Sequence, residues 1–314
     1  MKFNKNEFGW KEKVSVDTNE LSDDVSIVNS LTVGTRIGDI GEYSVAEGDE
    51  ITASGYYSHA EGEGTTASGN VSHAEGADTT ASGNISHAEG GYTTASGTFS
   101  HAEGNSTEAS GEASHAEGYN TTASGYYSHA EGEYAKASGS DSHAEGSNTE
   151  ASGDFSHAEG NYAIASGYIS HAEGISSTAS GNYSHAEGRS TTASGYCSHA
   201  EGNWTIASGD YSHAEGSNTI ASSSNQHVQG KYNIEDTANT YAHIVGNGTA
   251  DNARSNAHTL DWNGNAWYKG ELYTGGTSQS DANKVLTTAN ISFNENGELV
   301  VTIGNVTKTF VPKQ

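Results

Sequence analysis

Serine, histidine and glutamate recur together along most of this 314-residue chain. The pentapeptide Ser-His-Ala-Glu-Gly begins at Ser58 and returns every 14 residues until Ser212, in twelve identical copies. Serine, histidine and a carboxylate are the side chains of a hydrolytic triad, and histidine with glutamate is also a common metal-ligand set. Three interpretations therefore compete, namely catalysis, metal binding and a structural ladder of paired side chains.

The spacing within the pentapeptide disfavours catalysis. Neighbouring residues of a strand point to opposite faces, so Ser58 and His59 cannot form a nucleophile–base pair within one repeat. Twelve equivalent copies would also be unusual for an active site. We therefore predict no catalytic residues and no enzymatic activity in the repeats.

Metal binding and a structural ladder both remain open for the histidines. Imidazoles from three chains that meet at an axis would form a His₃ metal site at each level. In the ladder, each histidine instead pairs with the glutamate two residues later on the same face, within one chain or between chains. We favour the ladder, since a buried histidine or glutamate without a partner is costly, and we expect no metal and no cofactor.

The predicted ladder lies at an interface between chains. Its members are His59, Glu61, His73, Glu75, His87, Glu89, His101, Glu103, His115, Glu117, His129, Glu131, His143, Glu145, His157, Glu159, His171, Glu173, His185, Glu187, His199, Glu201, His213 and Glu215. Acid that protonates the glutamates would leave stacked imidazolium charges unpaired and loosen the assembly. A melting temperature unchanged between neutral pH and about pH 4 would argue against this ladder.

Each 14-residue repeat consists of two similar halves that predict short strands. Residues 58–62 align with residues 65–69 in the pattern small-x-Ala-x-Gly, and two further residues follow each half. Five alternating residues and a two-residue corner indicate a strand and a turn, with glycine supplying the positive φ of the corner. Two strands and two corners make one coil of a parallel solenoid over about residues 41–230. A helix is disfavoured because glycine recurs every seven residues.

The alternation also assigns the faces of each coil. The small residues of the pattern point into a narrow interior, and the histidines and glutamates point outward. A column of mostly large apolar residues precedes the pentapeptides, namely Tyr57, Val71, Ile85, Phe99, Tyr127, Phe155, Ile169, Tyr183, Cys197 and Tyr211. An interior of alanine and glycine buries too little apolar surface to be stable alone, so we predict self-association, as a homotrimer.

The composition limits the classes of partner that the protein is expected to bind. With 40 acidic and 13 basic residues the formal net charge is −27, which disfavours nucleic acids and anionic lipid surfaces as partners. A single cysteine excludes an intramolecular disulfide framework. The first residues have no apolar segment of a secretory signal and no run is long enough to span a membrane, so we expect no membrane insertion. Part of the acidic charge is expected to be balanced by the histidines.

The repeat resembles that of a known protein family. The pattern small-x-Ala-x-Gly resembles the head repeat of YadA-type trimeric adhesins, with His59 and Glu61 where that family has valine and isoleucine; Val45 in the first coil retains the valine. The resemblance implies an all-β fold: a left-handed parallel β-roll of 14-residue coils that forms homotrimers. A small β-rich C-terminal domain follows it.

The C-terminal part shows a second resemblance. Residues 241–248 and 254–270 resemble a segment of tail and appendage proteins from phages and prophages of Gram-positive bacteria. Some of those relatives continue into a self-cleaving chaperone of the peptidase G2 type, whereas this chain ends in short strand patterns at residues 291–293, 298–303 and 308–311. We therefore expect the chaperone domain to be absent.

A cluster of nonrepetitive residues lies within the second region. We interpret it as core and trimer contacts of a cap that covers the open end of the solenoid. Its members are His243, His258, Asp261, Trp262 and Trp267.

These observations predict three parts: an N-terminal attachment segment (1–30), a β-roll (31–230) and a C-terminal cap or tip (231–314). The predicted function is that of a fibre or appendage of a phage tail or phage-derived particle, assembled in the bacterial cytoplasm and used outside the cell. Its expected partners are two further copies of the chain, tail or baseplate proteins, and a bacterial surface receptor, with carbohydrate as one candidate. The alternatives are a cell-surface trimeric adhesin and a self-cleaving appendage protein.

Overall fold

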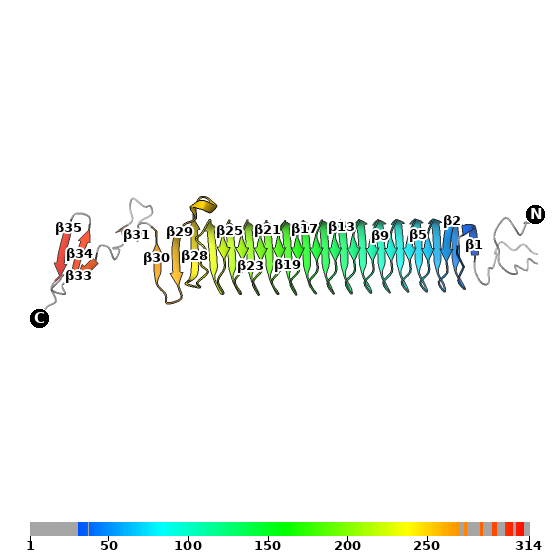
Figure 1. The fold of residues 1–314 in the computed structure, drawn as a ribbon, viewed down its shortest axis with the longest axis horizontal. Helices are drawn as coiled ribbons and strands as arrows, with labels where there is room; N and C mark the ends of the chain where they lie inside the picture. Colours follow the sequence, from blue (N-terminus) through cyan, green and yellow to red (C-terminus); the bar gives the residue numbers. More distant parts are fainter. Residues whose placement is uncertain are drawn as a thin grey trace, which may run out of the picture.

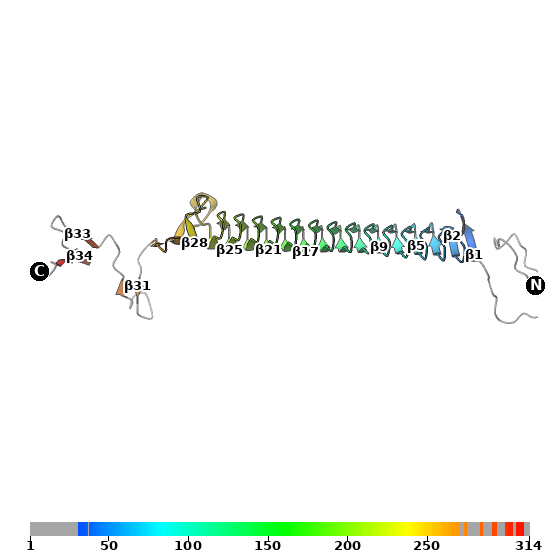
Figure 2. The same ribbon diagram turned by 90° about the horizontal axis from the view of Figure 1, so that it is seen from below.

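The computed structural model describes residues 31–36 and 38–269, together with five short strands nearer the C-terminus. The predicted attachment segment, residues 1–30, lies outside the described residues. The described residues from β1 to β30 form one long rod in which coil follows coil along a straight axis (Figures 1 and 2). This arrangement confirms the predicted all-β parallel solenoid.

Two kinds of strand alternate in the coils. The longer strands are β1 (Leu31–Arg36), β2 (Val45–Ala53), β3 (His59–Glu63), β5 (His73–Ala77), β7 (His87–Gly91), β9 (His101–Asn105), β11 (His115–Tyr119), β13 (His129–Glu133), β15 (His143–Ser147), β17 (His157–Asn161), β19 (His171–Ile175), β21 (His185–Arg189), β23 (His199–Asn203), β25 (His213–Ser217) and β27 (His227–Lys231). The two-residue strands are β4 (Thr66–Ala67), β6 (Thr80–Ala81), β8 (Thr94–Ala95), β10 (Glu108–Ala109), β12 (Thr122–Ala123), β14 (Lys136–Ala137), β16 (Glu150–Ala151), β18 (Ile164–Ala165), β20 (Thr178–Ala179), β22 (Thr192–Ala193), β24 (Ile206–Ala207) and β26 (Ile220–Ala221).

The register places equivalent residues of successive coils beside each other. In the pairing of β11 with β13, for example, His115 lies opposite His129 and Glu117 opposite Glu131. The short strands pair in the same way, with Ala109 opposite Ala123 in β10 and β12. Each column of the sequence repeat therefore becomes a straight row of identical side chains along the rod.

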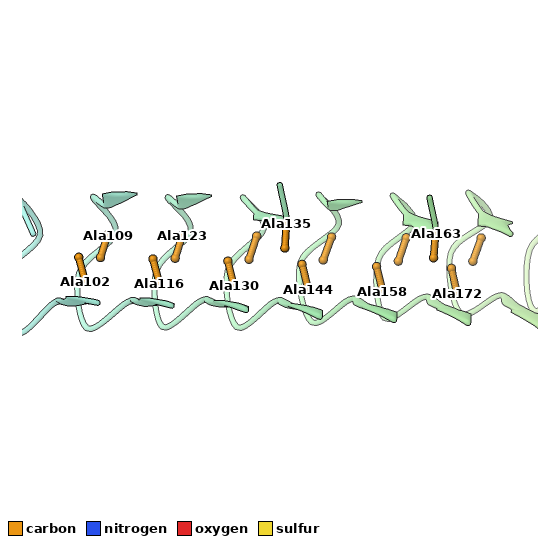
Figure 3. Packing of buried hydrophobic residues seen from close by; sticks show 14 of the residues in the cluster. Ala102, Ala109, Ala116, Ala123, Ala130, Ala135, Ala144, Ala158, Ala163 and Ala172 are labelled. Carbon is orange, nitrogen blue, oxygen red and sulfur yellow. The ribbon is translucent and has the colours of Figure 1, made fainter. Parts of the chain in front are cut away.

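The interior of the rod is built from alanine. The alanines of facing strands, such as Ala102 and Ala109, are fully buried and point toward one another (Figure 3). Serine hydroxyls close the corners; that of Ser128 donates a hydrogen bond of 2.8 Å to the carbonyl oxygen of Gly125. These small side chains let the two sheets approach closely, as the pattern predicts.

The two glycine columns have different roles, which corrects one expectation. Gly62 has a positive φ of 112°, as predicted. Gly69 does not, and the left-handed residue of its corner is Val71, with a φ of 56°. Gly69 is required instead by axial stacking, because a Cβ atom there would lie 1.8 Å from the carbonyl oxygen of Gly83.

The C-terminal end of the parallel stack is covered by an antiparallel hairpin. Strand β28 (Tyr241–Asn247) still pairs in parallel with β27, and the 3₁₀ helix η1 (Asp251–Ala253) follows it. Then β29 (Asn256–Asp261) and β30 (Ala266–Tyr268) pair antiparallel. The reversal of direction covers the edge that β28 would otherwise expose.

Beyond the hairpin only short strands are described. Strands β31 (Tyr273–Thr274) and β32 (Asn283–Lys284) pair antiparallel, and β33 (Ile291–Phe293), β34 (Leu299–Ile303) and β35 (Val306–Phe310) form a three-stranded antiparallel sheet. The three strand patterns predicted from residue 291 onward are therefore confirmed to within two residues at their starts. The division of the chain at residues 30 and 230 stays a prediction.

Candidate functional site

The outward face of the longer strands carries the predicted histidines and glutamates. We call it the histidine–glutamate face; its histidine row runs from His59 in β3 to His227 in β27, and its glutamate row runs beside it. The thirteen imidazole rings stack along the rod, with neighbouring ring centroids 4.7–4.8 Å apart and ring planes within 13° of parallel. This spacing is the strand separation of a parallel sheet. The structure therefore brings all twenty-four predicted ladder residues onto one face.

Pairing between the two rows is loose within one chain. The Nε2 atom of His115 lies 3.9 Å from Oε2 of Glu117, and most other pairs on a strand have the same distance. One contact between neighbouring coils is shorter: Nε2 of His87 lies 3.3 Å from Oε1 of Glu75 in the preceding coil. Most of these distances exceed hydrogen-bond length. All thirteen Nε2 atoms are buried without a hydrogen-bond partner. A ladder that forms between chains stays a prediction.

From Glu75 to Glu173, the glutamates of this face share protons along the row. The pKa of Glu117 is raised to about 7, first by its hydrogen bonds with the side chains of Glu103 and Glu131 and then by burial. The same cause raises the pKa of Glu173 to about 7. In turn, the pKa of Glu103 is lowered because its neighbours donate to it. The row therefore titrates as a unit, with protonated and ionised carboxyl groups alternating.

Burial lowers the pKa of six histidines of this face, His73, His101, His115, His143, His171 and His199. Burial lowers the pKa of His115, and the neighbouring imidazoles of His101 and His129 lower it further. A lowered pKa means that the unfolded chain takes up protons first, so this contribution to stability is lost as the pH falls through about 6.5. The expectation that the histidines balance part of the acidic charge inside the fibre stays a prediction. Protons shared in the glutamate row also reduce that charge.

The substitution Glu117→Gln tests this proton sharing. The stability that Glu117 contributes is present below its unfolded pKa of 4.5 and is lost as the pH rises through about 7. We therefore expect the variant to melt about 1–2 °C above the wild type at pH 8, since like charges opposed across strands cost about 0.2–1 kcal/mol. Thermal melting should show no gain at pH 4.5. Glu108→Gln, which removes the same charge from the other sheet, is the control; an equal gain there would contradict the interpretation.

The apolar column lies at a corner of each coil and is exposed. Tyr57, Val71, Phe99 and Tyr211 expose more than half of their surface. The predicted members of the column all have a left-handed backbone, with φ between 51° and 61°. This conformation costs roughly 1–2 kcal/mol for residues other than glycine, so the chain alone gains nothing from apolar side chains here.

The C-terminal cluster is only partly brought together. The ring centroids of His243 and His258 lie 5.5 Å apart in an edge-to-face arrangement. The histidine row thus continues into the hairpin. The carboxylate of Asp261 accepts backbone N–H bonds from Asn263 and Asn265 at 2.9 and 2.8 Å and so closes the β29–β30 turn. The side-chain amide of Asn265, which donates a hydrogen bond of 2.8 Å to Oδ2, lowers the pKa of Asp261, and the backbone bonds lower it further.

The two tryptophans of that cluster are half exposed, Trp262 at 49% and Trp267 at 54%. Trp262 donates a hydrogen bond of 3.2 Å from Nε1 to Oδ1 of Asn239. They are thus not core residues of the single chain. Their role as contacts between chains stays a prediction.

One structural residue escaped the sequence analysis. Asp236 is buried where the 14-residue period breaks, and its Oδ2 atom accepts bonds of 2.8 Å from the backbone N–H groups of Thr240 and Tyr241. It holds the loop that leads from β27 into β28. The signal available for it in the sequence is the Glu235-Asp236 pair at the point where the 14-residue period ends.

A comparison with protein families agrees with this geometry. The YadA head domain repeat matches residues 52–72, 74–100, 102–128, 116–142, 158–184 and 172–198. The matched coils are similar to YadA head repeats. The matched segments lie between residues 52 and 198, from β3 to β22, and leave residues 143–157 unmatched, whereas the histidine–glutamate face continues to β25. No curated protein matches the chain. Among the described residues, no helix is long and apolar enough to cross a membrane.

In the matched coils, Ser58 and His59 face opposite sides of the strand, as predicted. The Ser58 hydroxyl is buried and donates a hydrogen bond of 2.8 Å to the carbonyl oxygen of Gly55. His59 lies on the outward face. The two side chains therefore do not form a nucleophile–base pair within one repeat.

Proposed function

We propose that this chain forms a homotrimeric recognition fibre that contacts a bacterial surface. The YadA head repeats support an adhesin-like fibre, and the observation that carries the proposal is the uniformity of the exposed rows. The histidines repeat in every coil from β3 to β27, and the corner column beside them is apolar in most coils, with Ala113 and Asp141 as its two interruptions between Tyr57 and Tyr211. A symmetry-related copy can therefore make the same contact at every level, which is how cyclic assemblies arise.

The energetics favour assembly over an isolated rod. Burial of a large apolar side chain contributes roughly 1.5–3 kcal/mol, which offsets the backbone cost of the left-handed corner. The same contact would exclude water from the histidine–glutamate face and strengthen pairing between its two rows. Contact with a second copy of the chain would therefore stabilise both the apolar column and the histidine–glutamate face, whereas contact with water stabilises neither.

The fibre has two candidate settings. The resemblance of residues 241–248 and 254–270 to phage tail and appendage proteins supports a phage or phage-derived particle, with tail or baseplate proteins as partners. The YadA head repeats support a cell-surface adhesin equally well. Immunogold electron microscopy with antibodies against the roll separates them, since label on released particles supports the first setting and label on intact cells supports the second.

Binding to bacteria tests the function itself. Fluorescently labelled full-length protein should bind to the surface of susceptible bacterial cells in a saturable manner and be displaced by unlabelled protein. A labelled acidic protein of similar net charge is the control for nonspecific adhesion. Binding no greater than that of the control across a panel of strains that includes the source bacterium or its phage host would contradict the proposal.

A further inference from the structure

We propose that the histidine–glutamate face binds a row of divalent transition-metal ions, each held by two stacked histidines and one glutamate of the same chain. The sequence alone favoured a metal-free ladder, and its metal alternative placed three histidines from three chains around an axis. The side-chain geometry points to a different donor set, which is complete within one chain.

The donor atoms already lie together. At the centre of the rod, one ligand atom each from His115, Glu117 and His129 lies within 4.8 Å of the other two. The described residues contain nine such triplets. Those named besides the central one are His73–Glu75–His87, His143–Glu145–His157, His157–Glu159–His171 and His171–Glu173–His185.

The Nε2 atoms supply an independent reason. All thirteen from His59 to His227 are removed from solvent and lack a hydrogen-bond partner in the chain. Buried polar atoms without partners are rare in folded proteins, and each one calls for an explanation such as a bound ion. A row of thirteen buried imidazole nitrogens without partners therefore indicates that this face binds a ligand.

The donor chemistry selects the class of ion. Two imidazole nitrogens with one carboxylate oxygen suit Zn²⁺, Cu²⁺ or Ni²⁺, whereas Ca²⁺ and Mg²⁺ prefer oxygen ligands alone. Metal–nitrogen bonds of about 2.0–2.1 Å require the two nitrogens to approach within about 4.2 Å, so neighbouring rings must tilt toward each other. The side chains of His115 and Glu117 are 36% and 32% exposed, which leaves room for that movement.

The fold also provides access to the ions. Beside the glutamate row, the glycines that follow each glutamate leave an open groove, lined in one part by Glu89, Glu103, Glu117, Gly104 and Gly118. In the single chain, before other copies cover this face, an ion can therefore reach the carboxylates from the groove without unfolding a coil.

The number of ions follows from the sharing of histidines between triplets. Neighbouring triplets such as those around Glu145 and Glu159 use the same His157. If each of the thirteen histidines binds one ion, about six ions fit on one chain. Four of the named triplets have no histidine in common. We expect between about four and six ions per chain.

Equilibrium dialysis and electron paramagnetic resonance with the full chain, free of any histidine tag, test this proposal. After treatment with a chelator, the protein should bind about four to six Zn²⁺ ions per chain, and Cu²⁺ should show hyperfine coupling to two nitrogens. Fewer than one ion per chain, coordination by oxygen alone, or coupling to three nitrogens would each overturn it.

Matched variants locate the ions. The quadruple variant His115→Gln, His129→Gln, His143→Gln, His157→Gln should lose about two ions per chain, and Glu117→Gln with Glu145→Gln should weaken Zn²⁺ binding at the same coils while keeping the imidazole stack. Circular dichroism checks that both variants keep the roll. Glu108→Gln with Glu150→Gln removes the same charge from the other sheet and should leave the stoichiometry unchanged. Unchanged stoichiometry in a folded quadruple variant would overturn the proposal.

Discussion

The substitution Gly125→Ala is expected to lower the melting temperature by about 6–12 °C and to divide the rod into two weakly coupled halves. The added Cβ atom would lie 1.9 Å from the carbonyl oxygen of Gly139 and 2.6 Å from its carbonyl carbon. Because these atoms belong to the backbone, no side-chain movement relieves the overlap. The coils must separate locally, at a cost of about 3 kcal/mol, the upper part of the usual range for overpacking.

Gly91→Ala is the matched control for this variant. A Cβ atom at Gly91 would meet only the Nδ2 atom of Asn105, at 3.2 Å, and the preceding coil carries Ala77 at the equivalent position. It should therefore melt within about 1 °C of the wild type. Differential scanning calorimetry with limited proteolysis measures both variants. Equal melting temperatures for the two would mean that the coils do not stack as closely as the structure shows.

The triple substitution Phe155→Asn, Ile169→Asn, Tyr183→Asn is expected to have opposite effects on the single chain and on its assembly. Asparagine accepts the left-handed backbone more readily than these residues, and Asn225 already occupies the equivalent corner with a φ of 59°. The isolated roll should therefore keep its fold. The assembly loses three buried side chains per contact, so we expect dissociation constants at least about a thousandfold higher.

Sedimentation velocity over a range of concentrations measures this effect. The control is Ile164→Asn with Ile206→Asn, which removes exposed apolar side chains from the short strands β18 and β24 outside the column. That variant should assemble like the wild type. If instead the triple variant assembles normally and melts at a higher temperature, the apolar column faces solvent and contributes nothing to association.

The repeat made much of this architecture predictable. Alternation placed Ser58 and Ala60 inside and His59 and Glu61 outside, because successive residues of a strand must point to opposite faces. The 14-residue period then determined the in-register pairing that stacks His115 on His129. The same period aligned the apolar residues that precede the pentapeptides into one column. These features depend only on periodicity, which is why one sequence sufficed.

Other features depend on three-dimensional proximity, which a pattern does not carry. Val71 adopts a left-handed backbone, although a branched side chain gives no signal for it. Gly69 is glycine because of the coil above it and not because of its own φ. The proton sharing around Glu117 arises from carboxyl groups in successive coils. Trp262 and Trp267 lie outside the repeat, so no period in the sequence predicts that they are exposed.

Sedimentation equilibrium of the full chain at neutral pH tests the central claim most directly. A rod that associates through its repeating rows should have a mass three times that of the 32.5 kDa chain. A mass of 32.5 kDa at micromolar concentration would contradict the proposed homotrimer.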